Sequence, residues 1–427
     1  MADTIFALAS GAPPAAIAIV RISGPRAMAA AAMLAGDLPE PRRAGVRSLV
    51  DPLTGELLDK ALVLIFPGPA TATGEDLVEL HLHGGRAVVA AVQVALGRME
   101  GLRGAEPGEF TRRALAHGRI DLAEAEGLGD LLMAQTERQR RAAMTSVEGR
   151  LSRSVAGWAS DLLMISAQVE ASLDFSDEDD VGEEADPKIA AAISALVTSI
   201  ETALAEPPVD RLRDGVRVVL AGPRNAGKST LLNALVGREA AIVSPVAGTT
   251  RDVIEVPVVR DGIAYVFADT AGLIESTDDV VEAIGIARAR ETAAGADVVL
   301  WLDDMPPADA DSAIWLYPRA DARGACDDGV RLIVSARNGS GIDQLWSAIT
   351  GHAERLLPRE DSVAFNARQR ACCAECHAAL VAAIGTDDSL IVAEHLRVAR
   401  RALDRLLGRV DVEAMLDALF GRFCIGK

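Results

Sequence analysis

A phosphate-binding loop is the clearest chemical signal in the sequence. The stretch GPRNAGKST at 222–230 follows the apolar run VRVVLA and precedes LLNALVG, which is typical of a helix. In this spacing backbone N–H groups converge on phosphates, the lysine reaches the β and γ oxygens, and the serine ligates Mg²⁺. We therefore predict a nucleotide site here, with Lys228 also acting in catalysis. The predicted contacts are Asn225, Ala226, Gly227, Lys228, Ser229 and Thr230.

Two later stretches suit the metal and the γ-phosphate of a switch GTPase. VFADTAG places Asp269 at the end of an apolar strand, where it can hold Mg²⁺ through water, and Gly272 three residues later can sense the γ-phosphate. AGTTRD at 247–252 offers Thr250 as a second hydroxyl, so Ser229 and Thr250 are the predicted Mg²⁺ ligands. Three such elements in this order favour a switch GTPase over a generic ATPase. The same two stretches add the nucleotide contacts Gly248, Thr249, Thr270 and Ala271.

The base-recognition segment departs from the usual pattern. Switch GTPases carry Asn-Lys-x-Asp after the next strand, whereas this chain has Pro318-Arg319-Ala320-Asp321, followed by Ser335 and Ala336 in VSAR. Asp321 keeps the carboxylate that selects guanine, and Arg319 can stack over the purine as a lysine stem does. Pro318 has no side-chain amide and no backbone N–H, so the tie that asparagine makes to the phosphate loop is lost. We expect guanine preference with weakened affinity.

Composition limits the possible partners and compartments. The chain has 427 residues, a formal net charge of −19 and only 3% aromatic residues. Binding phosphates through counterion release needs clustered Lys and Arg, so any RNA contact must be local or shared with a partner. The N-terminus has no basic region before an apolar one, no uninterrupted apolar run approaches the roughly 18 residues of a membrane span, and five cysteines fit reduced thiols. These features predict a cytoplasmic protein without a membrane anchor.

The elements that position these motifs suggest a multidomain α/β and α protein. Strand-like runs alternate with Ala-rich helical stretches over residues 1–118, which predicts an α+β domain. Apolar residues then recur at helical spacing over 119–211 and again over 356–427, and strands alternate with helices over 212–355. Neither helical half is able to bury its apolar face alone. We therefore expect one helical bundle into which a doubly wound phosphate-loop GTPase domain is inserted.

The chain resembles the MnmE (TrmE) family of tRNA-uridine modification GTPases from end to end. The resemblance rests on GPRNAGKS, AGTTRD, DTAG, GEDLVELHLHGG at 74–85, EPGEFTRRA at 106–114 and the final FCIGK. It implies a homodimer joined through N-terminal domains that bind a 5-formyl- or methylene-tetrahydrofolate. It also implies a heterotetramer with an FAD-dependent partner of the MnmG (GidA) type, which carries the only FAD. Together they would install a carboxymethylaminomethyl-type group on C5 of the wobble uridine of certain tRNAs.

The resemblance also implies roles for particular residues. Glu282 matches a glutamate that orients or activates water, which matters because Leu273 stands where small GTPases have glutamine. Cys424 is either a nucleophile for uracil or a packed thiol. The implied folate contacts are Arg21, Glu79, Lys427 and Arg119, the last in place of the family's common lysine, and they suit an anionic tail and a pterin with amide-like donors. The implied K⁺ ligands are Asn225, Ser244, Val246 and Thr249, of which Ser244 and Val246 also count as nucleotide contacts.

Two further patterns have simpler explanations. CCAECH at 372–377 matches the c-type haem attachment pattern, but the stretch is typical of a helix and no export signal accompanies it, so no haem is expected. His81 and His83 share one side of a strand without an evident third ligand, which makes strand packing the default. Two other functions stay open on these observations. One is a ribosome-assembly switch GTPase, which would lack a folate pocket, and the other is a folate-binding scaffold with a weakened G domain.

Overall fold

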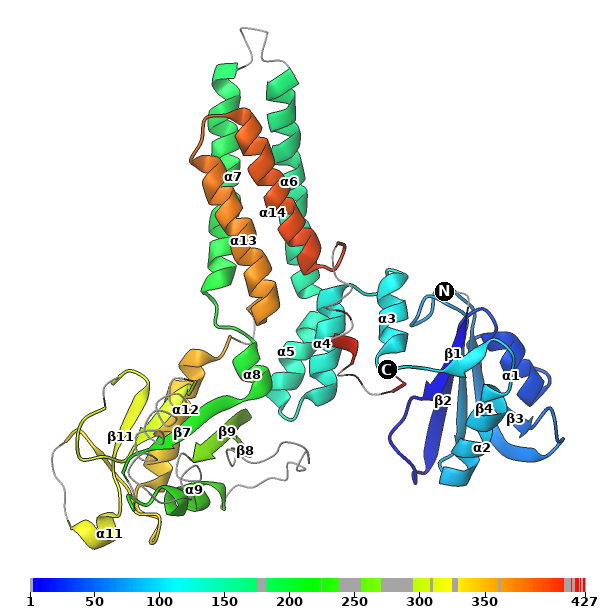
Figure 1. The fold of residues 1–427 in the computed structure, drawn as a ribbon, viewed down its shortest axis with the longest axis horizontal. Coiled ribbons are helices and arrows are strands. Elements are labelled where there is room, and N and C mark those ends of the chain that lie inside the picture. Colours follow the sequence, from blue (N-terminus) through cyan, green and yellow to red (C-terminus); the bar gives the residue numbers. More distant parts are fainter. Residues whose placement is uncertain are drawn as a thin grey trace, which may run out of the picture. The chain divides into compact units, whose positions relative to one another are not determined.

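The computed structural model describes residues 3–174, 182–223, 225–237, 255–269, 295–307, 310–324, 329–359, 362–410, 416, 419–421, 423 and 425–426. The chain divides into two compact units, and Figure 1 shows the elements of each. The first unit consists of Met1–Gly129, Ser146–Ser152 and Asp404–Lys427, and the second of Asp130–Thr145 and Arg153–Leu403.

The first unit contains a six-stranded sheet. Its strand order is β3-β4-β5-β2-β1-β6, and all neighbouring strands are antiparallel except β1 and β6, which are parallel. The strands are β1 (Thr4–Leu8), β2 (Ile17–Ser23), β3 (Gly45–Val50), β4 (Leu57–Phe66), β5 (Leu77–His83) and β6 (Leu102–Gly104).

Two helices, α1 (Ala27–Ala35) and α2 (Arg86–Gly97), cover one face of this sheet. The sequence of β5, LVELHLH, explains which face. Successive side chains of a strand point to opposite sides, and Val78, Leu80 and Leu82 lie in the core with the helices. Glu79 and His81, which alternate with them, therefore lie on the opposite face.

Helix α3 (Glu109–Ala116) follows this sheet, and the chain continues into α4 (Leu122–Met133) and α5 (Glu137–Val147). Residues near the C-terminus return to the same unit, where Ile425 forms a β-bridge with Pro107. Gly426 has a left-handed φ of 97°, and a Cβ added there would lie 2.0 Å from the carbonyl oxygen of Leu8. Only glycine permits this approach, so Gly426 seats the end of the chain against β1.

The second unit contains a bundle of long helices, which Figure 1 draws with α6, α7, α13 and α14. Trp158 of α6 donates its indole N–H to Ser199 of α7 at 3.0 Å, and Arg370 of α13 donates to the carbonyl of Glu206 just after α7 at 3.1 Å. Helices from both sides of the nucleotide domain thus pack together, which confirms the inserted arrangement. The bounds are α6 (Arg150–Asp174), α7 (Gly182–Ala205), α13 (Ala367–Ile384) and α14 (Ser389–Leu406).

The chain enters and leaves the nucleotide domain at adjacent positions. The backbone N–H of Val209, just before the domain, donates to the carbonyl of Phe365, just after it, at 3.0 Å. Phe365 also packs against Trp158 of the bundle, with the ring centroids 6.4 Å apart.

The nucleotide domain is built on a second six-stranded sheet with the order β12-β11-β10-β7-β9-β8, in which only β8 is antiparallel to its neighbour. Its central strand VRVVLA is almost continuously apolar, as is typical of a parallel strand buried on both faces. The doubly wound fold is confirmed. Its elements are α8 (Asp210–Asp214), β7 (Val216–Ala221), α9 (Lys228–Val236), β8 (Glu255–Arg260), β9 (Ile263–Asp269), β10 (Val298–Trp301), β11 (Ala313–Tyr317), α11 (Ala320–Arg323), β12 (Leu332–Ile333) and α12 (Ile342–Leu356).

One stretch of the described residues, Pro187–Asp214, is long and apolar enough to cross a membrane when judged by length and mean hydropathy alone. Core helices of globular proteins pass the same test. The apolar residues Ile189, Ile193, Leu196 and Ile200 of this stretch are buried. That burial is what a bundle helix requires.

Candidate functional site

The phosphate loop connects β7 to α9, as predicted. Asn225 and Gly227 have left-handed φ values of 62° and 96°, so the loop turns sharply before the helix begins at Lys228. The Lys228 side chain is buried and its Nζ donates to the carbonyls of Gly222 and Pro223 at 2.7 and 2.9 Å. The loop's own backbone thus holds the ammonium group beside the turn. Ser229 and Thr230 are exposed in the first turn of α9, where the helix N-terminus favours an anion.

The strand next to β7 ends at Asp269, the first residue of DTAG. Asp269 ends β9, and its backbone pairs in register with Leu220 of β7, two residues before Gly222. The structure thus brings the backbone of Asp269 next to the strand that leads into the phosphate loop.

The segment predicted to read the base contains an oriented carboxylate. Ser335, which has no exposed surface, donates its hydroxyl to Oδ1 of Asp321 at 2.6 Å. This hydrogen bond is the main cause that lowers the pKa of Asp321 below its ordinary value. Asp321 is therefore ionised at neutral pH with one oxygen fixed, as recognition of guanine N–H groups requires. Ala336, the other predicted contact here, is half-buried.

Arg319 forms a tie to the phosphate loop that the sequence alone did not indicate. Its Nη1 donates to the carbonyl of Asn225 at 3.3 Å, and a Cβ added to Gly227 would lie 3.4 Å from its Cγ. Arg319 itself has a left-handed φ of 58°. Pro318 removes the asparagine amide, but a guanidinium from the next residue connects the base-recognition segment to the loop instead.

The face of the N-terminal sheet opposite α1 and α2 carries a charged pair. Arg21 on β2 and Glu79 on β5 are direct cross-strand partners, and Nη2 of Arg21 lies 2.8 Å from Oε1 of Glu79. The Arg21 guanidinium also lies over the ring of Phe110, 5.8 Å from its centroid. His81 is the third member, because its Nε2 is 3.5 Å from Oε2 of Glu79. Two of the predicted folate contacts therefore meet.

Of the other two predicted folate contacts, the structure describes Arg119. Arg119 donates from Nε to the carbonyl of Thr71 at 3.0 Å, so it rests on the loop that leads into β5. Lys427 lies outside the described residues, although its neighbour Gly426 packs against Leu8 of β1. Cys424 also lies outside them. Both readings of that thiol therefore stay as the sequence leaves them.

Several further predictions fall outside the part of the chain that the structure describes. They concern the second Mg²⁺ ligand, the K⁺ ligands other than Asn225, the residues after Asp269 and the water-activating glutamate. These residues are Ser244, Val246, Gly248, Thr249, Thr250, Thr270, Ala271, Gly272 and Glu282.

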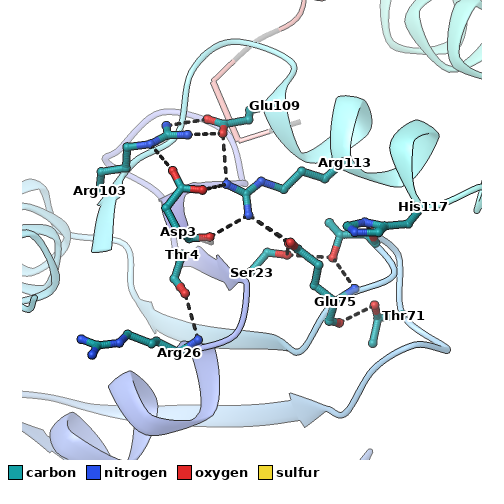
Figure 2. A network of polar contacts seen from close by, with 11 residues as sticks. Asp3, Thr4, Ser23, Arg26, Thr71, Glu75, Arg103, Glu109, Arg113 and His117 are labelled. Carbon is teal, nitrogen blue, oxygen red and sulfur yellow. Dashed lines mark hydrogen bonds and ion pairs between the residues drawn. The ribbon is translucent and has the colours of Figure 1, made fainter. Parts of the chain in front are cut away.

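A buried polar network next to the charged pair was missed by sequence reasoning. Figure 2 shows Arg113 of α3 at its centre, pointing toward Asp3, Glu75 and Glu109. Charged residues are rarely buried unless they are paired, and Arg113 is only 2% exposed. The only sequence signal was Glu109 and Arg113 four residues apart in EPGEFTRRA, which places them on one face of a helix.

The residues of the haem-like and His-x-His patterns differ in their surroundings in the described structure. Cys373 and Cys376 lie on α13 and are fully buried, and burial raises the pKa of both thiols to about 12. His83 pairs with Asp59 at 2.7 Å rather than with His81. Within the described residues no group of three or more His, Cys, Asp or Glu side chains is arranged to hold a metal ion.

A phosphate loop between a buried strand and a helix, together with an oriented carboxylate at the base-recognition segment, defines a phosphate-loop GTPase that carries two additional structural parts. Comparison with known families agrees. The chain matches the family description "GTP-binding protein TrmE N-terminus" over residues 4–119 and "MnmE helical domain" over residues 122–424.

Individual proteins extend this similarity over the whole chain. The tRNA modification GTPase MnmE of Rhizorhabdus wittichii is 57% identical over 427 residues, covering 100% of this chain and 97% of that protein. The protein of the same name from Erythrobacter litoralis is 56% identical over 430 residues and is covered completely, as is this chain. The chain belongs to the MnmE family of tRNA modification GTPases. It is a GTP-hydrolysing enzyme, and it binds GTP with Mg²⁺.

Two solved structures are similar to part of the chain. The G domain of the T. maritima FeoB iron transporter is 22% identical, with a TM-score of 0.24, and covers 32% of this chain and 98% of that one. Aquifex aeolicus Era bound to GDP and aluminium fluoride is 24% identical, with a TM-score of 0.25, and covers 40% of this chain and 68% of that one.

Proposed function

We propose that this GTPase uses a tetrahydrofolate one-carbon unit to modify C5 of the wobble uridine in tRNA, together with an FAD-dependent partner. The observation that carries the proposal is the Arg21–Glu79 pair on the face of the N-terminal sheet opposite α1 and α2. Family membership supports the tRNA and GTPase parts. The proposed assembly is a homodimer that joins the partner in a heterotetramer in the cytoplasm, and the product carries a carboxymethylaminomethyl-type group.

The residues present on this face of the sheet fit a folate. Oε1 of Glu79 takes the hydrogen bonds from Arg21, whereas Oε2 has only the longer contact with His81. Nε2 of His81 is buried and has no hydrogen-bond partner within the described structure. A carboxylate oxygen suits the N–H donors of a pterin, and the basic residues Arg21, Arg119 and Lys427 suit the anionic tail. Bound folate, as the 5-formyl or methylene derivative, supplies the one-carbon unit.

The nucleotide site works through positioning and charge. Lys228, next to the loop's turn, is suited to the β and γ oxygens, and Ser229 with Thr250 would hold Mg²⁺. Asn225, Ser244, Val246 and Thr249 are the proposed K⁺ ligands, and Glu282 is the proposed residue for activating water. When two G domains close, the movement shifts the helical bundle, and the bundle in turn shifts the folate and tRNA site.

RNA recognition in this proposal is local or shared. The net charge of −19 opposes a broad phosphate-binding surface, so the FAD-dependent partner supplies much of the contact with tRNA. Cys424 is either the group that attacks the uracil or a thiol packed near the folate.

Two measurements test the proposal. Calorimetric titration of the purified protein with 5-formyl-tetrahydrofolate should give saturable binding, and mass spectrometry of tRNA from cells lacking the protein should show unmodified wobble uridines. Normal wobble uridines in those cells would overturn the proposal. Replacing K⁺ by Na⁺ tests the cation separately, because the proposal expects GTP turnover to fall. Absence of folate binding would favour a binding switch without modification chemistry.

A further inference from the structure

A largely buried charge network connects residues of two sequence motifs that have no role in the proposed sites. Glu75 belongs to GEDLVELHLHGG, and Glu109 and Arg113 belong to EPGEFTRRA. Figure 2 shows these side chains turned toward one another, together with Asp3 and Arg103. Two arginines therefore face three carboxylates inside the N-terminal unit.

Arg113 is the only member that reaches both ends of this network. Its Nη2 donates to Oδ1 of Asp3 and to Oε1 of Glu109 at 3.0 and 3.2 Å. Its Nη1 donates to both carboxylate oxygens of Glu75 at 3.1 Å. Arg103 also binds Asp3 and Glu109, but within the described residues it makes no hydrogen bond or ion pair with Glu75. The link from α3 to the loop before β5 thus runs through Arg113.

Glu75 in turn organises the loop between β4 and β5. Its side chain accepts a hydrogen bond from Ser23 Oγ at 2.8 Å, and its carbonyl accepts one from the hydroxyl of Thr71 at 2.6 Å. Ser23 also hydrogen-bonds the hydroxyl of Thr73 at 2.7 Å. Thr71 and Thr73 are buried although they lie in a loop. Fixing Glu75 therefore fixes the backbone of residues 71–75.

This loop carries the groups that hold the segment after α3. Arg119 donates from Nε to the carbonyl of Thr71 at 3.0 Å, and Nδ1 of His117 is 2.8 Å from the carbonyl of Thr73. A Cβ added to Gly74 would lie 2.6 Å from Cβ of His117, so the two segments are in close contact. The direction of the Arg119 side chain is thus set by the loop that Arg113 holds.

We propose that Arg113 is a positioning residue that aims Arg119 at the anionic part of the folate, acting through Glu75 and the carbonyl of Thr71. This inference rests on the proposed folate function. Arg113 itself is buried and both of its terminal nitrogens donate to protein groups (Figure 2), so it acts through Arg119. The longer and forked side chain of Arg119 needs such a support more than a lysine would, because its donors have a fixed geometry.

The first experiment measures 5-formyl-tetrahydrofolate affinity in Arg113→Met and in the matched control Arg103→Met. Arg103 shares Asp3 and Glu109 with Arg113 and is more exposed, so its loss disturbs the same ions without touching Glu75. We expect the Kd of R113M to be about tenfold higher than that of wild type, which corresponds to about 1.4 kcal/mol. The Kd of R103M should lie within about twofold of wild type. Equal Kd values for wild type and a folded R113M would overturn the inference.

A double-substitution cycle separates positioning from general damage. If Arg113 acts through Arg119, the double variant R113M/R119M binds folate no more weakly than R119M alone. Additive losses would contradict the proposal. Should R113M fail to fold, Thr71→Val supplies the second variant, because it removes only the hydroxyl that ties Thr71 to Glu75. We expect T71V to raise the Kd several-fold in the wild-type background and not in the R119M background. Unchanged binding in both backgrounds would contradict the inference.

The controls also separate this inference from the folate proposal itself. If wild-type protein does not bind 5-formyl-tetrahydrofolate, the folate function fails. If wild type binds and the Arg113 variants bind equally well, only the positioning role fails. GTP turnover, measured on the same samples, should stay at the wild-type rate in both Arg113 and Arg103 variants.

Discussion

The hydroxyl of Ser335, with no exposed surface, donates to the carboxylate of Asp321 at 2.6 Å, across 14 positions of the chain. This bond both orients the carboxylate and lowers its pKa. We therefore propose that base recognition depends on this pair rather than on Asp321 alone.

Ser335→Ala should therefore weaken guanine nucleotide binding. Loss of one hydrogen bond to a charged group costs about 1.5 to 3 kcal/mol, or roughly 10- to 100-fold in GDP affinity. Calorimetry with GDP and ADP should show the loss for GDP and little change for ADP. Ser347→Ala, which removes an exposed hydroxyl on α12, is the matched control. Unchanged GDP affinity in S335A would refute the role of the pair.

Arg319→Met should weaken the attachment of the base-recognition segment to the phosphate loop. Arg319 donates to the carbonyl of Asn225, and the net value of such a bond is about 1 kcal/mol, so GDP affinity should fall about fivefold. Arg319→Lys should recover part of the loss because its ammonium retains a donor.

The control for Arg319 lies on the short helix α11, which Arg319 immediately precedes. Arg323 pairs with Asp304 at 2.8 Å, and R323M should leave GDP affinity close to wild type. Equal effects of R319M and R323M would mean that α11 is merely destabilised.

Arg21→Met and Glu79→Gln should each reduce folate affinity, and the losses should not add. The two side chains form one 2.8 Å pair, so removing either one also disturbs the other. Titration of the two single variants and the double variant measures the coupling. His83→Leu is the control, because His83 lies four residues from Glu79 along the same strand and is paired with Asp59. Strictly additive losses of folate affinity would show that Arg21 and Glu79 act independently.

The buried network should make the N-terminal unit sensitive to acid. Burial opposes ionisation of Asp3 and Glu109, but hydrogen bonds from Arg103 and charges around them outweigh it and hold the pKa of both below their ordinary values of 3.8 and 4.5. Because the folded pKa is the lower one, their stabilisation is complete above about pH 5 and is lost as the pH falls through the folded pKa.

Hydrogen exchange of the amides in β1 and β6 at pH 7 and pH 4 measures this effect. Glu109→Gln should speed exchange at pH 7, because breaking a buried ion pair costs about 3 to 5 kcal/mol. It should also narrow the difference in amide protection between pH 7 and pH 4. Glu137→Gln is a useful contrast. Arg140 and Arg141 lower the pKa of Glu137 to about 2, but all three side chains are exposed, so that variant should exchange like wild type. Identical pH responses of E109Q and wild type would count against the network.

Local patterns were predictable and long-range pairings were not. The alternation in β5 and the spacing of the phosphate loop depend on neighbouring residues, so the sequence alone placed both on the right elements. Arg113 meets Asp3 across 110 positions, and Arg319 meets Asn225 across 94. Such pairs depend on how strands and loops close in space, and nothing near either residue in the sequence signals its partner.

The pairing of Arg21 with Glu79 lies between these cases. The resemblance to a known family named both residues, but only the register of β2 against β5 makes them neighbours. Conversely, the cysteines of α13 showed that a local pattern can mislead, because their spacing matches a haem motif while both sulfur atoms are buried in the bundle.

The hydrogen bond between Val209 and Phe365 has a practical meaning for engineering. Since these backbone positions touch, a bridge of a few residues would reconnect the helices after excision of the segment between them. We therefore expect that the helical bundle and the nucleotide domain can be prepared as separate polypeptides and studied one at a time.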